Sequence, residues 1–136
     1  MDNFRVVIYG GRDFSDFNKL THYLDRMLSS KMVTHNIIIV SGRAKGADIL
    51  GEKFANLRGY KVEVHKADWN NIDVVGAVVK SNARGMYNAV AGHMRNDVMA
   101  DECDVGVGFW NGKSAGTKDM TKRLADRGKP CKVVAY

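Results

Sequence analysis

The sequence predicts an α/β fold, a single Rossmann-like domain in which a parallel sheet of about five strands carries helices on both faces. Short β-branched runs alternate with longer segments whose apolar residues recur at helical spacing. This alternation along the whole chain is typical of parallel sheets built from βαβ units. In addition, three of the five predicted strands end in glycine-rich turns. These observations predict one domain over residues 1–136.

The first half of the chain contains three predicted strands and two predicted helices. The strands are FRVVIYG (4–10), NIIIVSG (36–42) and YKVEVH (60–65). The middle run is continuously apolar, as expected for a strand that is buried on both faces. Apolar residues at helical spacing predict helices over residues 16–30 and 46–58. The apolar side of the second helix is expected to carry Ala47, Leu50, Phe54 and Leu57.

The second half continues the pattern after one interruption. Helices are predicted over 93–102 and 116–127, and strands at DVGVGF (104–109) and KPCKVVAY (129–136). Residues 69–90 are too long for a short connection and lack a sustained period. We interpret 70–90 as an insertion that serves as a lid or an oligomer contact, with a disordered surface loop as the alternative.

Composition limits the choice of partners. No apolar run approaches the roughly 20 residues that span a bilayer, and the N-terminus lacks the pattern of a signal peptide, so we expect a cytoplasmic protein without a membrane partner. Cys103 and Cys131 are not at metal-ligand spacing, so neither a zinc site nor a disulfide framework is expected, and no cofactor is predicted. The formal charge of +6 suits an anionic partner, either a nucleotide, a polyphosphate or nucleic acid. The basic residues are spread along the chain, so charge alone selects none of these.

The turn SGRAKGAD follows the second predicted strand. Its candidate ligand-binding residues are Ser41, Gly42, Arg43, Lys45, Gly46 and Asp48. The glycines let a ligand approach the backbone, and the helix that follows presents free N–H groups. The two cations suit phosphate. Asp48 either accepts hydrogen bonds from ribose hydroxyls or stabilises the helix N-terminus.

Two other turns carry similar groups. The candidates after the fourth strand are Gly112, Lys113, Ser114, Gly116 and Thr117, and those after the first are Gly10, Gly11, Arg12 and Asp13. Ser114 and Thr117 suit both a helix cap and a phosphate cradle. Arg12 either stacks on a base or clamps a phosphate, or it forms a surface pair with Asp13.

The stretch AGHMRNDVMADECD adds Arg95 and Asn96 near the start of a helix. Met94, Val98 and Met99 are expected on the far side of that helix. Ligands of open α/β sheets bind beyond the carboxyl ends of the strands, so we expect the turns and Arg95 to share one site. A helix-surface arginine is the alternative.

Together these motifs resemble the SLOG superfamily, which contains the LOG nucleotide phosphoribohydrolases and the DNA-processing Smf/DprA proteins, and most of all its YspA-related branch of bacteria and phages. The motifs are Gly10–Asp13, Gly42–Asp48, Ala67-Asp68-Trp69, Ala91–Met99 and Gly112–Thr117. The resemblance implies a Rossmann-like fold with a pocket for a nucleotide or a nucleotide-derived ligand, and it adds Trp69 to the candidate residues.

The resemblance also bears on catalysis. Hydrolytic LOG members use an arginine and a glutamate, and aligning their motifs here keeps Arg95 but places Met120 where the glutamate belongs. A thioether cannot act as a general acid or base. Asp119 is adjacent, but one residue on a helix is about 100° of rotation, so it should point elsewhere.

Three functions follow, in this order. The leading hypothesis is non-catalytic binding, for sensing or sequestration, of ADP-ribose, a nucleoside phosphate, or a signal derived from a cyclic nucleotide or NAD. The occurrence of the branch in phages suggests capture of a host defence signal. The second is a LOG-like phosphoribohydrolase that uses Arg95, with Asp119 or Asp13 as the carboxylate. The third is DprA-type DNA binding, with Trp69 or Tyr87 stacking on bases. A homo-oligomer, dimer or tetramer, is also expected, because relatives often form them.

Overall fold

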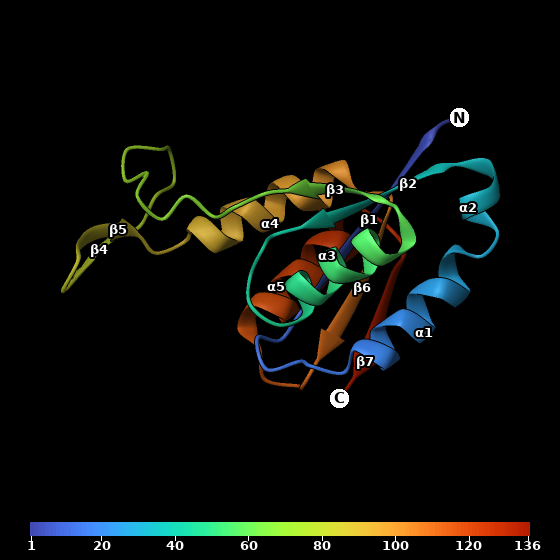
Figure 1. The fold of residues 1–136 in the computed structure, drawn as a ribbon. Coiled ribbons are helices and arrows are strands. Elements are labelled where there is room, and N and C mark those ends of the chain that lie inside the picture. The colour runs from blue at the N-terminus through green and yellow to red at the C-terminus, as the bar shows by residue number, and fades with distance from the viewer.

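The computed structural model describes all of residues 1–136 and contains one five-stranded parallel sheet (Figure 1). The sheet has the order β3-β2-β1-β6-β7. Its strands are β1 (Asn3–Gly10), β2 (Asn36–Ser41), β3 (Lys61–Val64), β6 (Val105–Trp110) and β7 (Cys131–Ala135). The helices are α1 (Phe17–Leu28), α2 (Lys31–Thr34), α3 (Ala47–Arg58), α4 (Ala91–Glu102) and α5 (Ala115–Asp126). The predicted α/β fold is therefore confirmed.

Helices cover both faces of the sheet. The side chains of β1 point alternately to the two faces and contact different helices on each. Val6 and Ile8 point to one face, where they pack in a cluster with residues of α1 and α3. Val7 and Tyr9 point to the other face and pack with residues of α4 and α5. A strand covered on both faces has no solvent side, which explains why these runs are apolar throughout.

The order of the strands creates the position for a site. From β1 the chain moves outward to β2 and β3, then crosses to β6 and moves outward again to β7. The connections that leave β1 and β6 therefore diverge to opposite sides, and a crevice opens beyond their carboxyl ends. Gly10 pairs with Phe109 at this edge, so the turns after the two strands begin at the same level.

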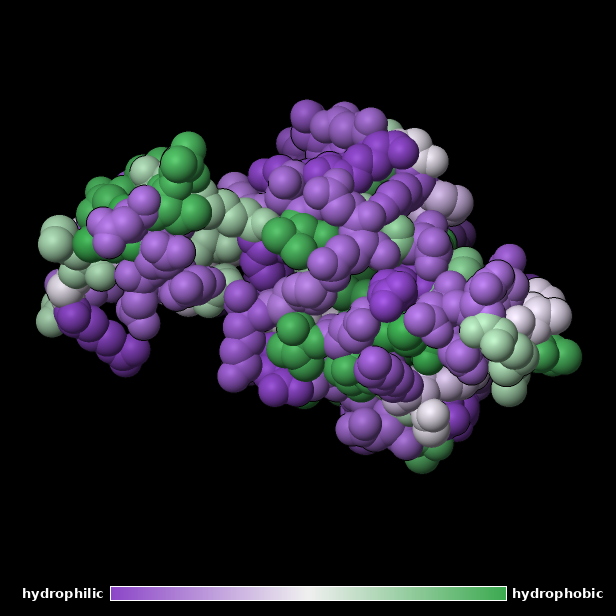
Figure 2. Space-filling view, turned by 90° about the horizontal axis from the view of Figure 1, so that it is seen from above, coloured by the Kyte–Doolittle hydropathy of each residue, from purple (hydrophilic) through white to green (hydrophobic).

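Residues 69–90, for which no helix or strand was predicted, contain an antiparallel hairpin of β4 (Val79–Asn82) and β5 (Gly85–Asn88). The hairpin projects from the body beyond the start of α4 (Figure 1). Figure 2 shows hydrophobic residues gathered on the projecting part of the molecule. Within residues 69–90, Val75 is 96% exposed and Met86 is 62% exposed. The strands are only four residues long, so their alternation was too short to detect in the sequence.

Other differences from the prediction are small. The short helix α2 was not predicted, and α4 begins at Ala91 rather than at residue 93. Leu57, expected on the apolar side of α3, is 61% exposed. No helix in the structure has the length and apolar character needed to cross a bilayer.

Candidate functional site

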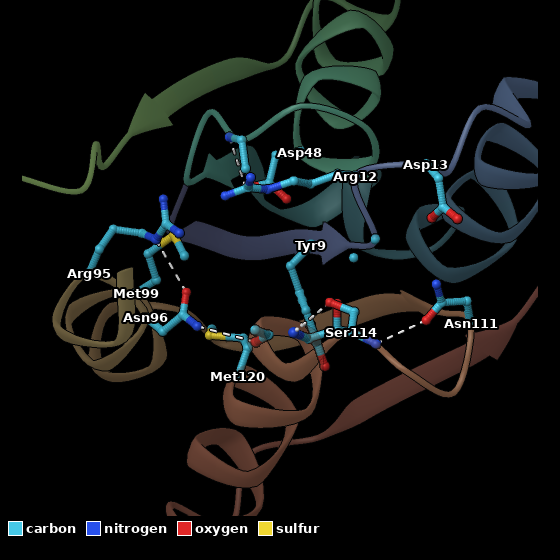
Figure 3. A pocket seen from close by; sticks show the side chains of 15 residues that line it. Tyr9, Arg12, Asp13, Asp48, Arg95, Asn96, Met99, Asn111, Ser114 and Met120 are labelled. Carbon is cyan, nitrogen blue, oxygen red and sulfur yellow. Dashed lines mark hydrogen bonds between the residues drawn. The ribbon is translucent and has the colours of Figure 1, made fainter. Parts of the chain in front are cut away.

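A cavity of about 450 Å³ lies at the carboxyl ends of β1 and β6, between the N-terminal ends of α3 and α5 and one side of α4 (Figure 3). Its lining comprises Tyr9, Gly10, Gly11, Arg12, Asp13, Ala44, Asp48, Arg95, Asn96, Met99, Asn111, Ser114, Gly116, Thr117 and Met120. The volume falls within the usual range for small-molecule sites, about 300–1,000 Å³. The three glycine-rich turns of the sequence analysis all lie at this edge.

Close backbone packing joins the turns after β1 and β2. The amide of Ala47 donates to the carbonyl oxygen of Gly11 at 3.3 Å. Gly46 has φ +89°, and a Cβ atom there would collide with the same carbonyl oxygen. Glycine is therefore required at position 46 by both conformation and space. The result is that α3 begins directly beside Gly11 and Arg12.

The N-terminus of α5 presents free amides to the cavity. Ser114 caps the helix by accepting a hydrogen bond from the amide of Thr117 at 3.3 Å. Asn111 Oδ1 accepts from the amides of Lys113 and Ser114, at 2.9 and 3.0 Å. The amides of Ala115 and Gly116 donate to no acceptor of the protein. Unpaired amides at a helix N-terminus carry partial positive charge and favour an anion.

Arg12 and Arg95 bring full positive charge to the opposite part of the cavity. Neither forms a salt bridge, whereas the arginines at 5, 43, 58, 123 and 127 all do. Arg95 instead donates from Nη1 to the carbonyl oxygen of Gly42 at 2.7 Å and from Nε to Asn96 Oδ1 at 3.2 Å. Burial lowers the pKa of Arg95, and the nearby charge of Arg12 lowers it further. The nearby carboxyl group of Asp48 acts in the opposite direction on the pKa of Arg95 but forms no salt bridge with it. Two guanidinium groups are thus held close together, and neither has a salt-bridge partner.

Asp48 is the buried carboxyl group of the site, at 4% exposure near the start of α3. Its Oδ2 atom accepts a hydrogen bond from the amide of Ala44 at 3.3 Å. Burial raises the pKa of Asp48 to about 6, although Arg95 and the backbone amides act in the opposite direction. Asp48 can therefore accept hydrogen bonds from a ligand at neutral pH and becomes protonated under mildly acidic conditions.

The other acidic candidates are already engaged. Asp119 Oδ2 accepts from Asn96 Nδ2 at 3.1 Å and from Arg123 Nε at 2.9 Å, and Asp119 does not line the cavity. This position agrees with the rotation expected on α5. Asp13 does line the cavity, but it accepts a hydrogen bond from the Tyr136 hydroxyl, which lowers the pKa of Asp13.

Tyr9, Met99 and Met120 form the apolar part of the lining. All three are at least 96% buried and belong to the same core cluster. The Tyr9 hydroxyl is fixed by hydrogen bonds to Thr121 Oγ1 at 2.7 Å and Cys131 Sγ at 3.1 Å. Met99 was expected on the side of α4 opposite Arg95, which is wrong: it lies one turn after Arg95 and faces the same cavity (Figure 3). Met120 lies in the cavity wall at the position that resembles the LOG glutamate.

The structure brings ten of the predicted residues into the cavity lining. They are Gly10, Gly11, Arg12, Asp13, Asp48, Arg95, Asn96, Ser114, Gly116 and Thr117. Five lining residues were not among the predicted binding residues, namely Tyr9, Ala44, Met99, Asn111 and Met120.

The remaining predicted residues lie around the cavity. Ser41 is fully buried and bonds to Glu52 at 2.7 Å, so it supports the turn from behind. Gly42 and Gly46 shape the same turn through the contacts described above. Arg43 and Trp69 line a neighbouring hollow. Lys45, Gly112 and Lys113 are exposed outside both hollows.

This arrangement suits an anion that also carries hydroxyl and apolar groups. Helix amides and two guanidinium groups favour phosphate. Asp48 provides an acceptor on the wall. The Asn96 amide also lies on the wall, but it already donates to the carbonyl oxygen of Gly116 at 3.3 Å and to Asp119 Oδ2 at 3.1 Å, so it supports the site from within the protein. The side chains of Tyr9, Met99 and Met120 offer an apolar surface for a ring.

Comparison with known proteins agrees with this reading of the fold. The model of the YspA, cpYpsA-related SLOG family matches residues 4–71, which contain the turns after β1 and β2. The chain belongs to this family. No curated protein matches the chain.

Solved structures extend the similarity over almost the whole chain. DNA processing protein A (DprA) from Streptococcus pneumoniae has a TM-score of 0.67 and 20% identity, over 97% of this chain and 50% of that protein. DprA from Helicobacter pylori, described with a single-stranded DNA binding mode, has a TM-score of 0.66 and 20% identity, over 96% of this chain and 64% of that protein. TM1055 has a TM-score of 0.59 and 22% identity, over 96% of this chain and 72% of that protein.

This family member therefore spans half of one DprA protein and less than two thirds of the other. At such identities the similarity establishes a shared fold. The site itself must be argued from the residues of this chain.

Proposed function

We propose that the protein binds a nucleotide-derived ligand without cleaving it, as a sensor or a sequestering protein. The observation that carries the proposal is the cationic pair Arg12 and Arg95, which shares one cavity with the free amides of the α5 N-terminus. The two guanidinium groups lack salt bridges and repel each other, which costs free energy in the unliganded protein, and an anionic ligand offsets that cost.

The ligand would use each part of the cavity for a different group. A phosphate would accept hydrogen bonds from the amides of Ala115 and Gly116. The guanidinium groups of Arg12 and Arg95 would bind a second anionic group. Ribose hydroxyls would donate to Asp48. ADP-ribose, a nucleoside phosphate and a signal derived from a cyclic nucleotide or NAD all carry these groups.

Binding is favoured over cleavage because the cavity lacks a carboxylate at the position that LOG enzymes use. Met120 lies there, Asp119 is hydrogen-bonded outside the cavity, and Asp13 is bonded to Tyr136. One observation favours phosphoribohydrolase activity as the second candidate. The pKa of Asp48, about 6, is suited to a general acid near neutral pH. Chromatography of free base released from AMP tests this candidate, and release that Asp48→Asn abolishes would establish it.

Isothermal titration with AMP, ADP-ribose, NAD and 3′,5′-cyclic AMP tests the binding proposal. We expect a dissociation constant below about 1 mM for at least one of them. Arg95→Ala should weaken that binding by about tenfold or more, since a hydrogen bond to a charged group contributes about 1.5–3 kcal/mol. Arg26→Ala is the matched control, because Arg26 is exposed on α1 and lies outside the cavity. Absence of binding across the panel would contradict the proposal.

A further inference from the structure

A second hollow of about 240 Å³ adjoins the main cavity. Its lining consists of Arg12, Arg43, Ala44, Lys66, Ala67, Trp69 and Arg95. Arg12, Ala44 and Arg95 also line the main cavity, so these residues form the boundary between the two spaces. A ligand that reaches past the two guanidinium groups would enter the second hollow.

The second hollow is cationic, with no acidic residue in its lining. Arg43 pairs with Glu52 at 2.8 Å, but Arg12, Lys66 and Arg95 have no salt-bridge partner. The main cavity differs because Asp13 and Asp48 line it. The two arginines at the boundary repel each other, and an anion placed between them would relieve that repulsion.

Trp69 provides an aromatic surface at the far side of this hollow. Trp69 is 43% exposed, and the only other aromatic residue with a comparable exposure is Tyr136, at 39%. The edge of the indole ring lies against Gly92 at the start of α4, where a Cβ atom would be 3.4 Å from Cη2. The carbonyl oxygen of Trp69 accepts a hydrogen bond from the amide of Asn88 in β5 at 2.7 Å. The hairpin therefore fixes the backbone that carries this ring.

We propose that the ligand is a two-part nucleotide, a dinucleotide or a nucleotide joined through phosphate to a second ring-bearing group. This inference rests on the proposed function. One nucleoside occupies the main cavity, the linking phosphate lies between Arg12 and Arg95, and the second base stacks on Trp69. Aromatic side chains bind bases of any identity through their π-faces, so the second hollow adds affinity without strict base selection. A mononucleotide would leave the second hollow empty.

Calorimetry with AMP and NAD tests this inference on the purified protein. We expect NAD to bind at least about tenfold more tightly than AMP, as one stacked base contributes roughly that factor. Trp69→Ala should remove the advantage of NAD while leaving the affinity for AMP unchanged, and Trp69→Phe should restore part of it. Tyr87→Ala is the matched control, because Tyr87 is an aromatic residue of the nearby strand β5 but lines neither hollow.

Three results would overturn the inference. Equal affinities for AMP and NAD, or an equal loss for both in Trp69→Ala, would show that the second hollow takes no part, while the proposed function would stand. Tighter binding of an eight-nucleotide single-stranded DNA than of NAD, weakened by Trp69→Ala, would assign the hollows to a nucleic-acid strand. Lack of binding to every probe would overturn both proposals.

Discussion

The guanidinium group of Arg95 donates a hydrogen bond to the carbonyl oxygen of Gly42 at 2.7 Å, which ties α4 to the turn after β2. The bond fixes the orientation of the side chain through a neutral partner. A carboxylate partner would have neutralised the arginine, as happens at Arg123 and Arg127 between α4 and α5. Arg95 is therefore held in place with its charge still available.

Arg12→Ala should reduce the response of the protein to anions without reducing its stability in their absence. The substitution removes one member of the repelling pair with Arg95 and breaks no salt bridge. We expect inorganic pyrophosphate to raise the Tm of the wild-type protein, and to raise the Tm of Arg12→Ala by much less. Thermal denaturation with and without pyrophosphate measures both effects. Arg26→Ala should behave as wild type, and an identical shift in all three proteins would refute the role of Arg12.

Asp48→Asn should stabilise the protein at neutral pH. The folded-state pKa of Asp48 is raised to about 6, so between about pH 4 and 6 the folded state binds more protons than the unfolded state. Stability contributed by this group is therefore highest below about pH 4 and falls as the pH rises through 6. A shift of this size corresponds to about 2–3 kcal/mol of destabilisation at pH 7.

Urea denaturation at pH 4 and pH 7 measures this prediction. The asparagine variant should gain stability over wild type at pH 7 and lose that advantage at pH 4. Asp126→Asn is the control, because Asp126 is exposed and pairs only with Lys122 on the same helix. An asparagine variant that is less stable than wild type at pH 7 would show that the negative charge is needed near Arg95.

The sequence was sufficient to predict the strands of the sheet and the convergence of their turns, because both depend on local pattern. Buried parallel strands are continuously apolar, and glycines mark the turns. The cavity floor depends on contacts between distant segments. Tyr9 faces the cavity because Gly108, about a hundred residues later, leaves room for its ring. The alternating glycines of DVGVGF were a signal for this, since Gly106 and Gly108 lie on one face of β6.

Two other features were missed, each for a different reason. Met99 follows Arg95 by four residues, and the i, i+4 relation on a helix places the two on one side, which is the signal that the prediction overlooked. The β4–β5 hairpin has short strands and one exposed face, so nothing in its periodicity separated it from a loop.

Met120→Glu should lower both stability and anion affinity. Met120 is 1% exposed and packs in the cluster with Val7 and Leu124, so a carboxylate there lacks a cationic partner in the core. We expect a loss of about 2 kcal/mol or more at pH 7, and a smaller loss at pH 5, where the glutamate is more easily protonated. The added negative charge should also oppose phosphate binding.

Met120→Leu is the matched control for volume, and it should cost less than about 1.5 kcal/mol. Urea denaturation at both pH values and pyrophosphate titration measure the two effects. Unchanged stability in Met120→Glu would mean that a cation reaches the new carboxylate, and the interpretation of this wall as apolar would then be wrong.

Gly108→Ala and Gly116→Ala should have opposite effects on stability. A Cβ atom at Gly108 would lie 2.6 Å from Tyr9 Cζ, so the ring must move and its hydroxyl bonds to Thr121 and Cys131 must shift. Overpacking of this kind costs about 1–3 kcal/mol. At Gly116 a Cβ atom meets nothing within 4 Å, and alanine favours the helix by up to about 1 kcal/mol. Urea denaturation should therefore show a loss for the first variant and a gain for the second.

Gly116→Ala should also change the affinity for anions. Gly116→Ala places a methyl group at the N-terminus of α5, where the proposed phosphate binds, so its affinity for pyrophosphate should fall although the protein becomes more stable. Such a divergence between stability and affinity cannot arise from misfolding. If Gly116→Ala binds pyrophosphate as tightly as wild type, the amides of Ala115 and Gly116 are not the phosphate site, and Arg12 and Arg95 must bind the anion alone.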